Sequence, residues 1–443
     1  MKACPAVHWR GKRRTSMQYI RLIRSNRDFA RLWAAQLVSL LGDWFSTIVI
    51  SALIVSYTEG TGYQGIAVSG FLIARMIPPL LMRPLAGVLA DRFDRKGLLI
   101  ISDLLRALVV LGLLFTTQSP DYLPLIYVFV VLQFLVSSIF EPARNVIMPS
   151  ILYRHQLVIG NTLSSITWSA MLAVGAIAGG LVAQAFGTQI ALVIDALTFV
   201  LSALLVATVV VPEVPRSELG QPPRKAQDKS QRTFADGLRY LWRNPQTAAA
   251  LFVKSGQSIT SSDTLLIIYG TQVFVVGEQG VASMALLWAA FGVGAVVGPL
   301  LTNRFSDDSV PVLRRLISVG FALIVLGWLL WGLAPSLELL ALAVVVRAMG
   351  GSVNWTYSSV IIQQIVPDDY LGRVFSLDFA GFEFVQSISI LAFGLLIDAA
   401  GGDTIAHIVY LSALVAVLPL LMWVGVVRGI EKRESAEAVN GEF

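Results

Sequence analysis

The sequence predicts an all-α integral membrane protein with twelve transmembrane helices in two pseudo-symmetric six-helix bundles and both termini in the cytoplasm. Of its 443 residues, 56% are hydrophobic and only 14% are charged. Twelve helices of about 20 residues would take up roughly that apolar share of the chain. The basic residues gather in alternate loops, a distribution typical of membrane proteins whose basic loops stay in the cytoplasm.

Twelve apolar segments, each bounded by Gly, Pro or charged residues, are long enough to cross a bilayer as helices. The loops that follow the odd-numbered segments contain no Lys or Arg, whereas the opposite side holds most of the basic residues. This alternation places both termini inside and requires an even number of crossings. The expected spans are 32–57, 65–86, 97–116, 122–140, 157–184, 189–211, 247–272, 281–302, 313–334, 337–358, 374–398 and 405–427.

The longest loop divides the chain into two halves that resemble each other weakly at an offset of 214 residues. It opens with prolines from Pro212 to Pro223 and continues with apolar residues from Phe234 to Trp242 at helical spacing. That order predicts a linker followed by an amphipathic surface helix. The expected division is a cytoplasmic tail at 1–31, a six-helix bundle at 32–211, the linker at 212–246, a second six-helix bundle at 247–427 and a cytoplasmic tail at 428–443.

The most specific motif lies between the second and third spans, where residues 87–96 read GVLADRFDRK. It resembles the signature of the major facilitator superfamily, G-x-L-A-D-R-x-G-R-K, and departs from it only at Asp94. The glycine lets two helices approach closely, while the acid and the cations can bind a facing helix end and hold a cytoplasmic gate shut. An ordinary basic loop would explain the cations but not the spacing of the glycine and the acid. The residues of this gate motif are Gly87, Asp91, Arg92, Arg95 and Lys96.

A second motif, in the fifth span, runs from Gly175 through Gly179 and Gly180. It resembles the antiporter signature of the same superfamily, G-P-x-x-G-G, with Ala176 in place of the proline. Small residues also allow helices simply to pack closely, so the motif is explained equally well by packing.

The order of the spans, the distribution of charge and the motifs together resemble the drug:proton antiporter branch of the superfamily. This branch contains macrolide efflux pumps and the enterobactin exporter. Supporting segments are 41–43, 141–144, 194–199 and 372–376. The resemblance implies export of small amphipathic compounds in exchange for protons. One departure bears on coupling: the fourth-span position where such antiporters often carry arginine is Gln133, and the repeat-related residue in the tenth span is Arg347.

Ionisable residues inside the spans are functional candidates, because a charge near the middle of a bilayer costs about 2.5 to 3.5 kcal/mol on insertion scales. Asp43 in the first span and Arg75 in the second lie at similar depth when counted at about 1.5 Å per residue. We expect them to meet near mid-membrane. Protonation of Asp43 would then release Arg75 and couple transport to protons, unless the pair is a permanent structural one.

A second set of candidates lies in the C-terminal half and comprises Lys254, Asp263, Arg347 and Glu383. Any of them could line a cavity for substrate. Lys254 and Glu383 lie in the same half of the membrane, so an ion pair between them is expected either to act in transport or to stabilise a gate.

Four other charges inside the spans are expected to have local roles. Asp103 and Arg106, three residues apart, are assigned to the cytoplasmic charge cluster. Asp195 and Asp398 lie near the outer ends of their spans and are expected to cap helices or contribute to a gate.

The leading hypothesis is a secondary active exporter of drug, macrolide or siderophore type that works by alternating access, with protons and a small molecule as partners. The alternatives are a lysophospholipid or other lipid flippase, or an uncoupled facilitator of the same fold. Enzyme motifs such as H-E-x-x-H and G-x-S-x-G and the ATP-binding P-loop do not occur in the sequence. One cysteine and three scattered histidines predict no metal site or cofactor. We expect a monomer in the bacterial inner membrane, without a nucleic-acid partner.

Overall fold

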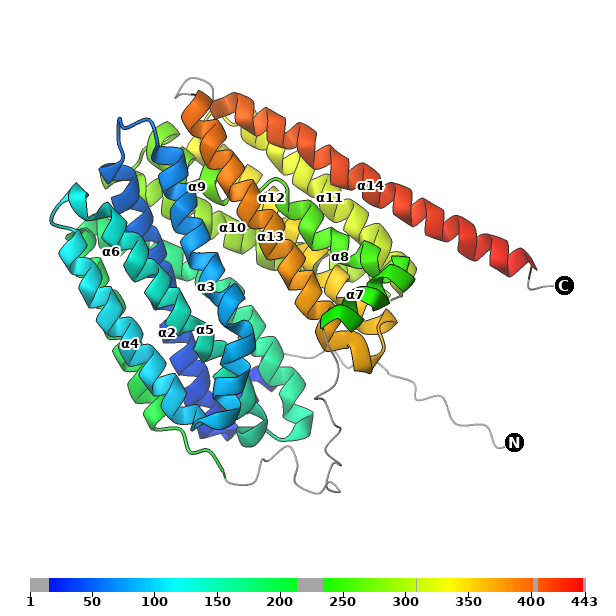
Figure 1. Ribbon diagram of the computed structural model, residues 1–443, viewed down its shortest axis with the longest axis horizontal. Helices are drawn as coiled ribbons and strands as arrows, with labels where there is room; N and C mark the ends of the chain where they lie inside the picture. The colour runs from blue at the N-terminus through cyan, green and yellow to red at the C-terminus, as the bar shows by residue number, and fades with distance from the viewer. Residues whose placement is uncertain (1–15, 213–233, 308, 401–404, 441–443) are drawn as a thin grey trace.

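The computed structural model describes residues 16–212, 234–307, 309–400 and 405–440, and all regular elements in these ranges are helical. Ten helical stretches are long and apolar enough to cross a membrane. Figure 1 shows two groups of helices that meet where α3 lies beside α13. We call α2–α6 the N-terminal bundle and α8–α14 the C-terminal bundle.

The N-terminal part consists of α1 (Ser16–Ser25), α2 (Arg27–Tyr57), α3 (Gln64–Arg92), α4 (Arg95–Thr116), η1 (Pro120–Tyr122), α5 (Leu123–Ile151) and α6 (Arg154–Ala207). The C-terminal part consists of α7 (Phe234–Arg243), α8 (Pro245–Ser258), α9 (Asp263–Ile268), η3 (Tyr269–Val273), η4 (Glu278–Gly280), α10 (Val281–Thr302), η5 (Asn303–Phe305), α11 (Val310–Gly332), α12 (Leu337–Ile365), α13 (Asp368–Ala400) and α14 (Ile405–Asn440). The tails at 1–15 and 441–443 and most of the predicted linker, 213–233, lie outside the described residues.

Three of the expected spans are divided differently in the structure. The fifth and sixth expected spans run together in α6, which is interrupted only at Gly187, where φ is +83°. Glycine takes this left-handed conformation without the steric cost that other residues pay. The seventh expected span is divided, because α8 ends at Ser258, α9 begins at Asp263 and a π-helical turn follows at Tyr269–Val273.

The first turns of several helices are fixed by short polar side chains. Asn26 caps α2 by accepting a hydrogen bond from the backbone N–H of Phe29 at 3.0 Å. Asp94 caps α4 by accepting one from Gly97 at 2.8 Å. A cap of this kind stabilises a helix by about 1 kcal/mol. Asp94, the residue at which the gate motif departs from the superfamily signature, therefore has a local structural role.

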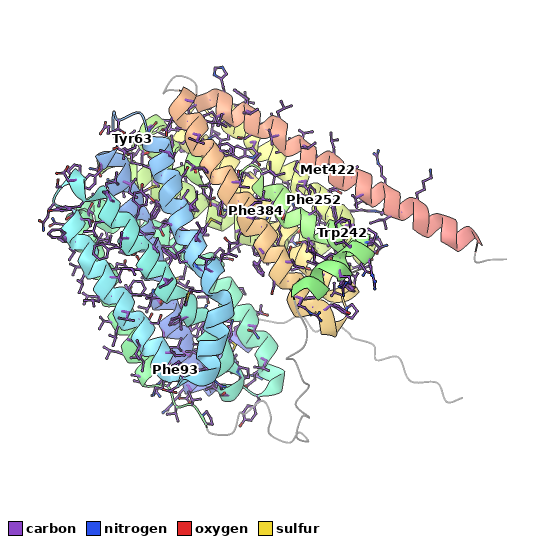
Figure 2. The ribbon with its side chains drawn as sticks, in the orientation of Figure 1. Tyr63, Phe93, Trp242, Phe252, Phe384 and Met422 are labelled. Atoms are coloured by element: carbon purple, nitrogen blue, oxygen red, sulfur yellow. The ribbon has the colours of Figure 1, made fainter. Side chains whose placement is uncertain are left out.

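Two membrane faces can be distinguished by residues labelled in Figure 2. Tyr63 lies at one end of the molecule, and Phe93 and Trp242 lie toward the other. We call the end with Tyr63 the distal face and the end with α1 and α7 the linker face. Large apolar side chains such as Phe384 and Met422 are exposed between these faces, as expected for surfaces that contact lipid chains.

The two bundles are joined close to the distal face. Asp398 on α13 accepts hydrogen bonds from the backbone N–H groups of Gly65 and Ile66 at 2.6 and 2.9 Å, so it caps α3 from the opposite bundle. One turn further along α3, the hydroxyl of Ser69 donates to the carbonyl of Ile390 at 2.8 Å. Toward the linker face α3 and α13 diverge (Figure 1). This arrangement is closed at the distal face, and Asp398 has the capping role expected of it.

Candidate functional site

A buried ionic network connects α2 and α4 in the N-terminal bundle. The guanidinium of Arg106 forms an ion pair with Asp43 and a second one with Asp103 at 3.3 Å. It also donates to the hydroxyl of Ser39 at 2.8 Å, while Asp103 accepts from Ser202 at 2.5 Å. The side chains of Asp103 and Arg106 are 0% and 1% exposed, but that of Asp43 is 18% exposed. Asp43 is therefore the carboxylate of this network that solvent reaches.

This network corrects two expectations from the sequence. Asp43 pairs with Arg106 and not with Arg75. Asp103 and Arg106 are buried between helices and do not belong to a cytoplasmic charge cluster. The sequence gives the depth of a residue in its span but not the direction in which its side chain points, and α4 presents both residues to the bundle interior. Buried charges of this kind need paired or hydrogen-bonded partners, which Arg106 has on three sides.

A second polar chain crosses the same bundle. Gln133 on α5 donates to the hydroxyl of Ser46 at 3.2 Å, and this hydroxyl in turn donates to Asp195 on α6. Asp195 is 0% exposed. Gly42 lies directly against Asp195, because a side chain at this position would meet the carboxylate. Asp195 thus joins helices inside the bundle and is neither a cap nor a gate residue in this conformation.

Arg75 lies beside aromatic rings. Its guanidinium carbon is 5.0 Å from the ring centroid of Phe134 and 5.7 Å from those of Trp44 and Phe71. Its Nε atom is buried and has no hydrogen-bond partner among the described residues. Trp44 in turn contacts Trp288 of the C-terminal bundle, with ring centroids 5.4 Å apart. Arg75 therefore lies at the boundary between the two bundles.

In the C-terminal bundle the main ion pair joins Lys254 on α8 to Asp378 on α13. Both side chains are 0% exposed. The ammonium also lies 4.7 Å from the ring centroid of Trp355 and 5.1 Å from that of Phe379. The partner of Lys254 expected from the sequence is Glu383. In the structure the partner is Asp378, which lies five residues earlier on the same helix. Glu383 is not part of this pair.

The break between α8 and α9 is held by side chains from three other helices. Arg347 on α12 donates to the carbonyl of Thr260 at 2.6 Å. The hydroxyl of Ser389 donates to the carbonyl of Ile259 at 2.8 Å and accepts from the N–H of Ser261 at 3.0 Å. Trp328 on α11 donates to the Thr260 hydroxyl at 3.2 Å. An interrupted helix inside a membrane requires such partners, because the freed backbone groups have no access to water.

Two of the predicted candidates thus lie at this break. Arg347 holds the Thr260 carbonyl, and its guanidinium also lies 4.7 Å from the ring centroid of Trp328. Asp263, the first residue of α9, accepts a hydrogen bond from Gln386 on α13 at 3.0 Å. Interrupted transmembrane helices often mark the binding region of a transporter, since their freed ends can face a ligand.

The internal repeat appears in these contacts. In the N-terminal bundle Gln133 contacts Ser46, and in the C-terminal bundle Arg347 contacts Thr260. Thr260 and Arg347 each lie 214 positions after their counterparts. Corresponding helices of the two bundles therefore touch through corresponding residues, with an amide in one bundle and a guanidinium in the other.

The gate motif at residues 87–96 lies only partly within the described residues. The side chains of Gly87, Asp91 and Arg92 lie outside the described residues, although the backbone there belongs to α3. Arg95 and Lys96 form the first turn of α4.

The fifth-span motif is a packing surface. A Cβ added at Gly175 would lie 2.8 Å from the Cβ of Trp44, and one added at Gly179 would lie 3.1 Å from the Cα of Phe45. Gly180 faces Ala285 of the other bundle in the same way. The three glycines therefore let α6 approach α2 and α10 closely.

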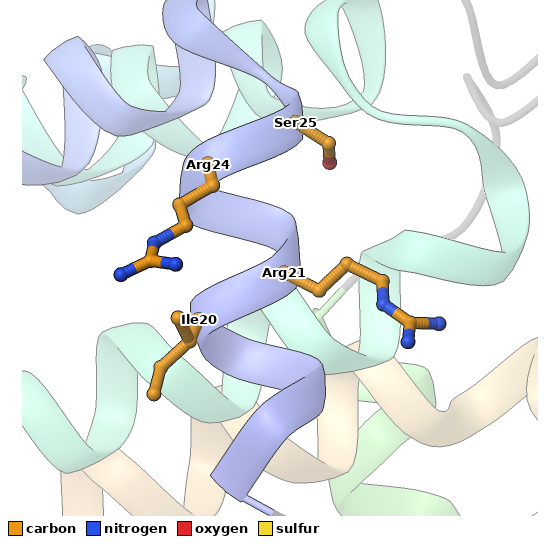
Figure 3. A pocket seen from close by; sticks show the side chains of 4 residues that line it. All are labelled: Ile20, Arg21, Arg24 and Ser25. Carbon is orange, nitrogen blue, oxygen red and sulfur yellow. The ribbon is translucent and has the colours of Figure 1, made fainter.

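Two surface hollows lie away from these charges. One, of about 490 Å³, is bordered by Ile20, Arg21, Arg24 and Ser25 on α1 (Figure 3). The other, of about 400 Å³, lies near Gly187 at the distal face. Within the described residues, no group of three or more His, Cys, Asp or Glu side chains is placed to hold a metal ion.

Comparison with known proteins gives the family of the chain. The sequence model of the Major Facilitator Superfamily matches residues 32–331. Macrolide efflux protein A of Streptococcus pyogenes is 26% identical over 84% of this chain and 90% of its own length. The enterobactin exporter of Citrobacter koseri is 20% identical over 80% of this chain and 81% of its own length.

Solved structures show the same fold. A bacterial homologue of the human lysosomal transporter Spinster, in an inward-facing and unoccupied conformation, has a TM-score of 0.71 at 13% identity and covers 93% of this chain and 98% of its own. Since the family match spans more than half of the sequence, the chain belongs to the Major Facilitator Superfamily and is a multi-pass transporter of the bacterial inner membrane, not an enzyme.

Proposed function

We propose that the protein is a secondary active exporter of small amphipathic compounds that works by alternating access and proton antiport. In this proposal the chain crosses the membrane twelve times as a monomer. The ten long apolar stretches account for this count when α6 is divided at Gly187 and the interrupted α8–α9 segment is added as one crossing. Both termini and the linker face are cytoplasmic, because the basic loops lie on that side.

The observation that carries the proposal is the Asp43–Arg106–Asp103 network. It lies inside the N-terminal bundle, and only Asp43 is accessible to solvent. Uptake of a proton by Asp43 would neutralise one of the two carboxylates that Arg106 binds. The contact between α2 and α4 would weaken, while Asp103 would still hold the guanidinium. A buried ionisable group with a partner of this kind is a typical proton relay in membrane transporters.

Movement of α2 would reach the other bundle through the residue next to Asp43. Trp44 contacts Trp288 of α10 and also packs against Gly175 of α6. With the linker face in the cytoplasm, the contacts of Asp398 and Ser69 close the observed arrangement to the outside, and α3 and α13 diverge toward the inside (Figure 1). Protonation and substrate binding would then shift the balance between this arrangement and one in which α3 and α13 separate at the distal face.

The substrate class is supported by the names of the relatives. The related proteins are named as exporters of macrolides, enterobactin and, in Bacillus subtilis, bacilysin. These compounds differ widely, so we assign to this chain only the broader class of small amphipathic molecules. The tryptophans at the boundary between the bundles are suitable for contact with the apolar part of such a molecule.

The proposal is tested with purified protein in liposomes that contain a pH-sensitive dye, using a panel of macrolides, siderophores, lipophilic cations and lysolipids. We expect at least one compound to drive proton flux, and we expect this flux to disappear in Asp43→Asn. Glu59→Gln, which removes an exposed carboxylate at the distal face, is the matched control and should behave as the wild type. Compound movement without protons, or unchanged coupling in Asp43→Asn, would support a facilitator or a lipid flippase instead.

A further inference from the structure

Arg75, a partly buried cation, differs in its partners from the buried cations of the protein. Every buried cation within the described residues has at least one oxygen atom as a hydrogen-bond partner. These cations are Arg106, Arg144, Lys254, Arg314 and Arg347. The guanidinium of Arg75 contacts aromatic rings, and no described carboxylate, carbonyl or hydroxyl is bound to it.

The described acidic side chains near Arg75 do not form a hydrogen bond or ion pair with it. Asp43 and Asp263 both act on Arg75 electrostatically, but each has another direct partner. Asp43 is paired with Arg106, and Asp263 accepts from Gln386. Ring faces attract a cation, but they offer no hydrogen-bond acceptors for the guanidinium N–H groups. The planar fork of Arg75 is therefore free to bind two oxygens of an incoming anion side by side.

The surroundings of Arg75 also indicate what kind of anion would fit. The rings of Phe71, Phe134 and Trp44 lie around the guanidinium, and Trp288 and Phe291 continue the aromatic surface into the C-terminal bundle, with ring centroids 6.0 Å apart. A hydrated inorganic anion would gain little from these rings. An oxyanion attached to a flat or apolar body would place its charge on Arg75. Trp44 and Trp288 are only 7% and 4% exposed, so they would contact this body once the two bundles move apart during transport.

We propose that Arg75 is the recognition residue for the oxyanion of an amphipathic organic anion, with Trp44 and Trp288 contacting the apolar part of the molecule. This inference rests on the proposed export function and narrows its substrate class to anions. The oxyanion has two possible sources, a carboxylate on an aromatic body or the phosphate of a lipid-like chain. Both would bind the guanidinium through the same paired hydrogen bonds.

The test measures binding to the full-length protein in detergent by equilibrium dialysis. The probes are 2-naphthoate, its neutral amide 2-naphthamide, and octyl phosphate. We expect at least one of the two oxyanions to bind tenfold more tightly than the amide, and the tighter of the two identifies the source. This comparison uses the wild-type protein and therefore does not depend on the folding of any variant.

Variants then assign the effect to Arg75. Arg75→Gln should remove the preference for the oxyanion. Arg75→Lys should keep part of it, because lysine retains the positive charge but lacks the two parallel N–H donors of the guanidinium. Arg304→Gln, which removes an exposed cation elsewhere, is the matched control and should bind as the wild type. Equal binding of amide and oxyanions, or an unchanged preference in Arg75→Gln, would overturn the proposal.

The two proposals fail in different ways. If the oxyanion binds through Arg75 but no compound drives proton flux in liposomes, the anion site stands and proton-coupled export is wrong. If cationic or neutral compounds are exported with protons and the oxyanions do not bind, the export function stands and the anion site is wrong.

Discussion

In the N-terminal bundle Arg106 pairs with two carboxylates, that of Asp43, which solvent reaches, and that of Asp103, which is buried. In the C-terminal bundle Lys254 pairs with Asp378 alone, and both side chains are fully buried. The first arrangement has two acids for one guanidinium, so one acid can gain a proton while the cation stays paired. The second has one acid for one cation, so loss of either charge leaves the other buried alone. In the proposed mechanism the N-terminal bundle therefore carries the element that takes up a proton, and the ion pair of Lys254 and Asp378 is a fixed clasp in the C-terminal bundle.

The bundles also differ in the helix that begins each repeat. In the N-terminal bundle α2 is continuous, and Gln133 reaches only a side chain on it, that of Ser46. In the C-terminal bundle the equivalent helix is interrupted, and Arg347 binds its free backbone at Thr260. A neutral amide suffices where the helix supplies its own hydrogen bonds, and a guanidinium is present where it does not.

The largest effect is expected when the C-terminal clasp is broken. Asp378→Asn would leave Lys254 as an unpaired buried charge, and removal of one partner of such a pair costs about 3 to 5 kcal/mol. We expect thermal unfolding in detergent to occur at a much lower temperature than in the wild type. Asp43→Asn should have a smaller effect, because Arg106 keeps Asp103.

The matched control replaces both charges of the clasp. The double variant Lys254→Met with Asp378→Leu removes the pair without leaving a lone charge, and such replacements are often close to neutral. A single Asp378→Asn variant as stable as the wild type would contradict the assignment of a fixed clasp.

An intermediate effect is expected at the interrupted helix. Arg347→Leu would leave the Thr260 carbonyl without its partner, and an unsatisfied buried acceptor costs about 1 to 3 kcal/mol. Gln133→Leu, at the equivalent position, should cost only about 0.5 to 1.5 kcal/mol, because Ser46 keeps its contact with Asp195. Unfolding of the two variants under the same conditions measures this difference. Equal losses would indicate that the two bundles do not differ in this respect.

The smallest effect on unfolding is expected where the bundles meet, because the strain introduced there can be relieved by a change of conformation. A Cβ at Gly65 would lie 2.6 Å from the carbonyl oxygen of Gly394, so Gly65→Ala should push α3 away from α13. Overpacking of this size costs about 1 to 3 kcal/mol, which corresponds to a shift of roughly fivefold to 150-fold toward the arrangement open at the distal face. Distances between spin labels across this face, introduced after replacement of Cys4, measure the shift. Gly429→Ala, with nothing within 4 Å of the added carbon, is the control and should leave the distances unchanged.

Much of the fold could be predicted from the sequence, because long apolar runs have few alternatives in a membrane. The expected span 281–302 coincides with α10, and 97–116 differs from α4 by two residues. The break in the seventh span was missed, although the run Ser258-Ile-Thr-Ser-Ser262 contains the signal. Serine and threonine side chains compete for backbone hydrogen bonds and favour helix ends.

Only part of the candidate site could be predicted, because Asp103 and Arg106 were expected in a cytoplasmic charge cluster, and the pairings could not be predicted. Asp43, Arg75, Lys254, Asp263 and Arg347 all lie at structurally significant positions, as their isolation in apolar runs indicates. Their partners depend on which helices are neighbours and on rotation about each helix axis, which depth counting does not provide. Asp378 was overlooked because α13 begins at Asp368, six residues before the predicted start, which places Asp378 nearly three turns into the helix.

The most direct test of the account counts the protons that are released when a transported compound binds to the purified protein in weakly buffered detergent solution. The wild type and the double variant Lys254→Met with Asp378→Leu should both release protons, because the clasp does not titrate during transport. Asp43→Asn should release none while still binding the compound. Proton release that persists in Asp43→Asn, or that disappears in the double variant, would contradict the assignment of proton coupling to the N-terminal bundle.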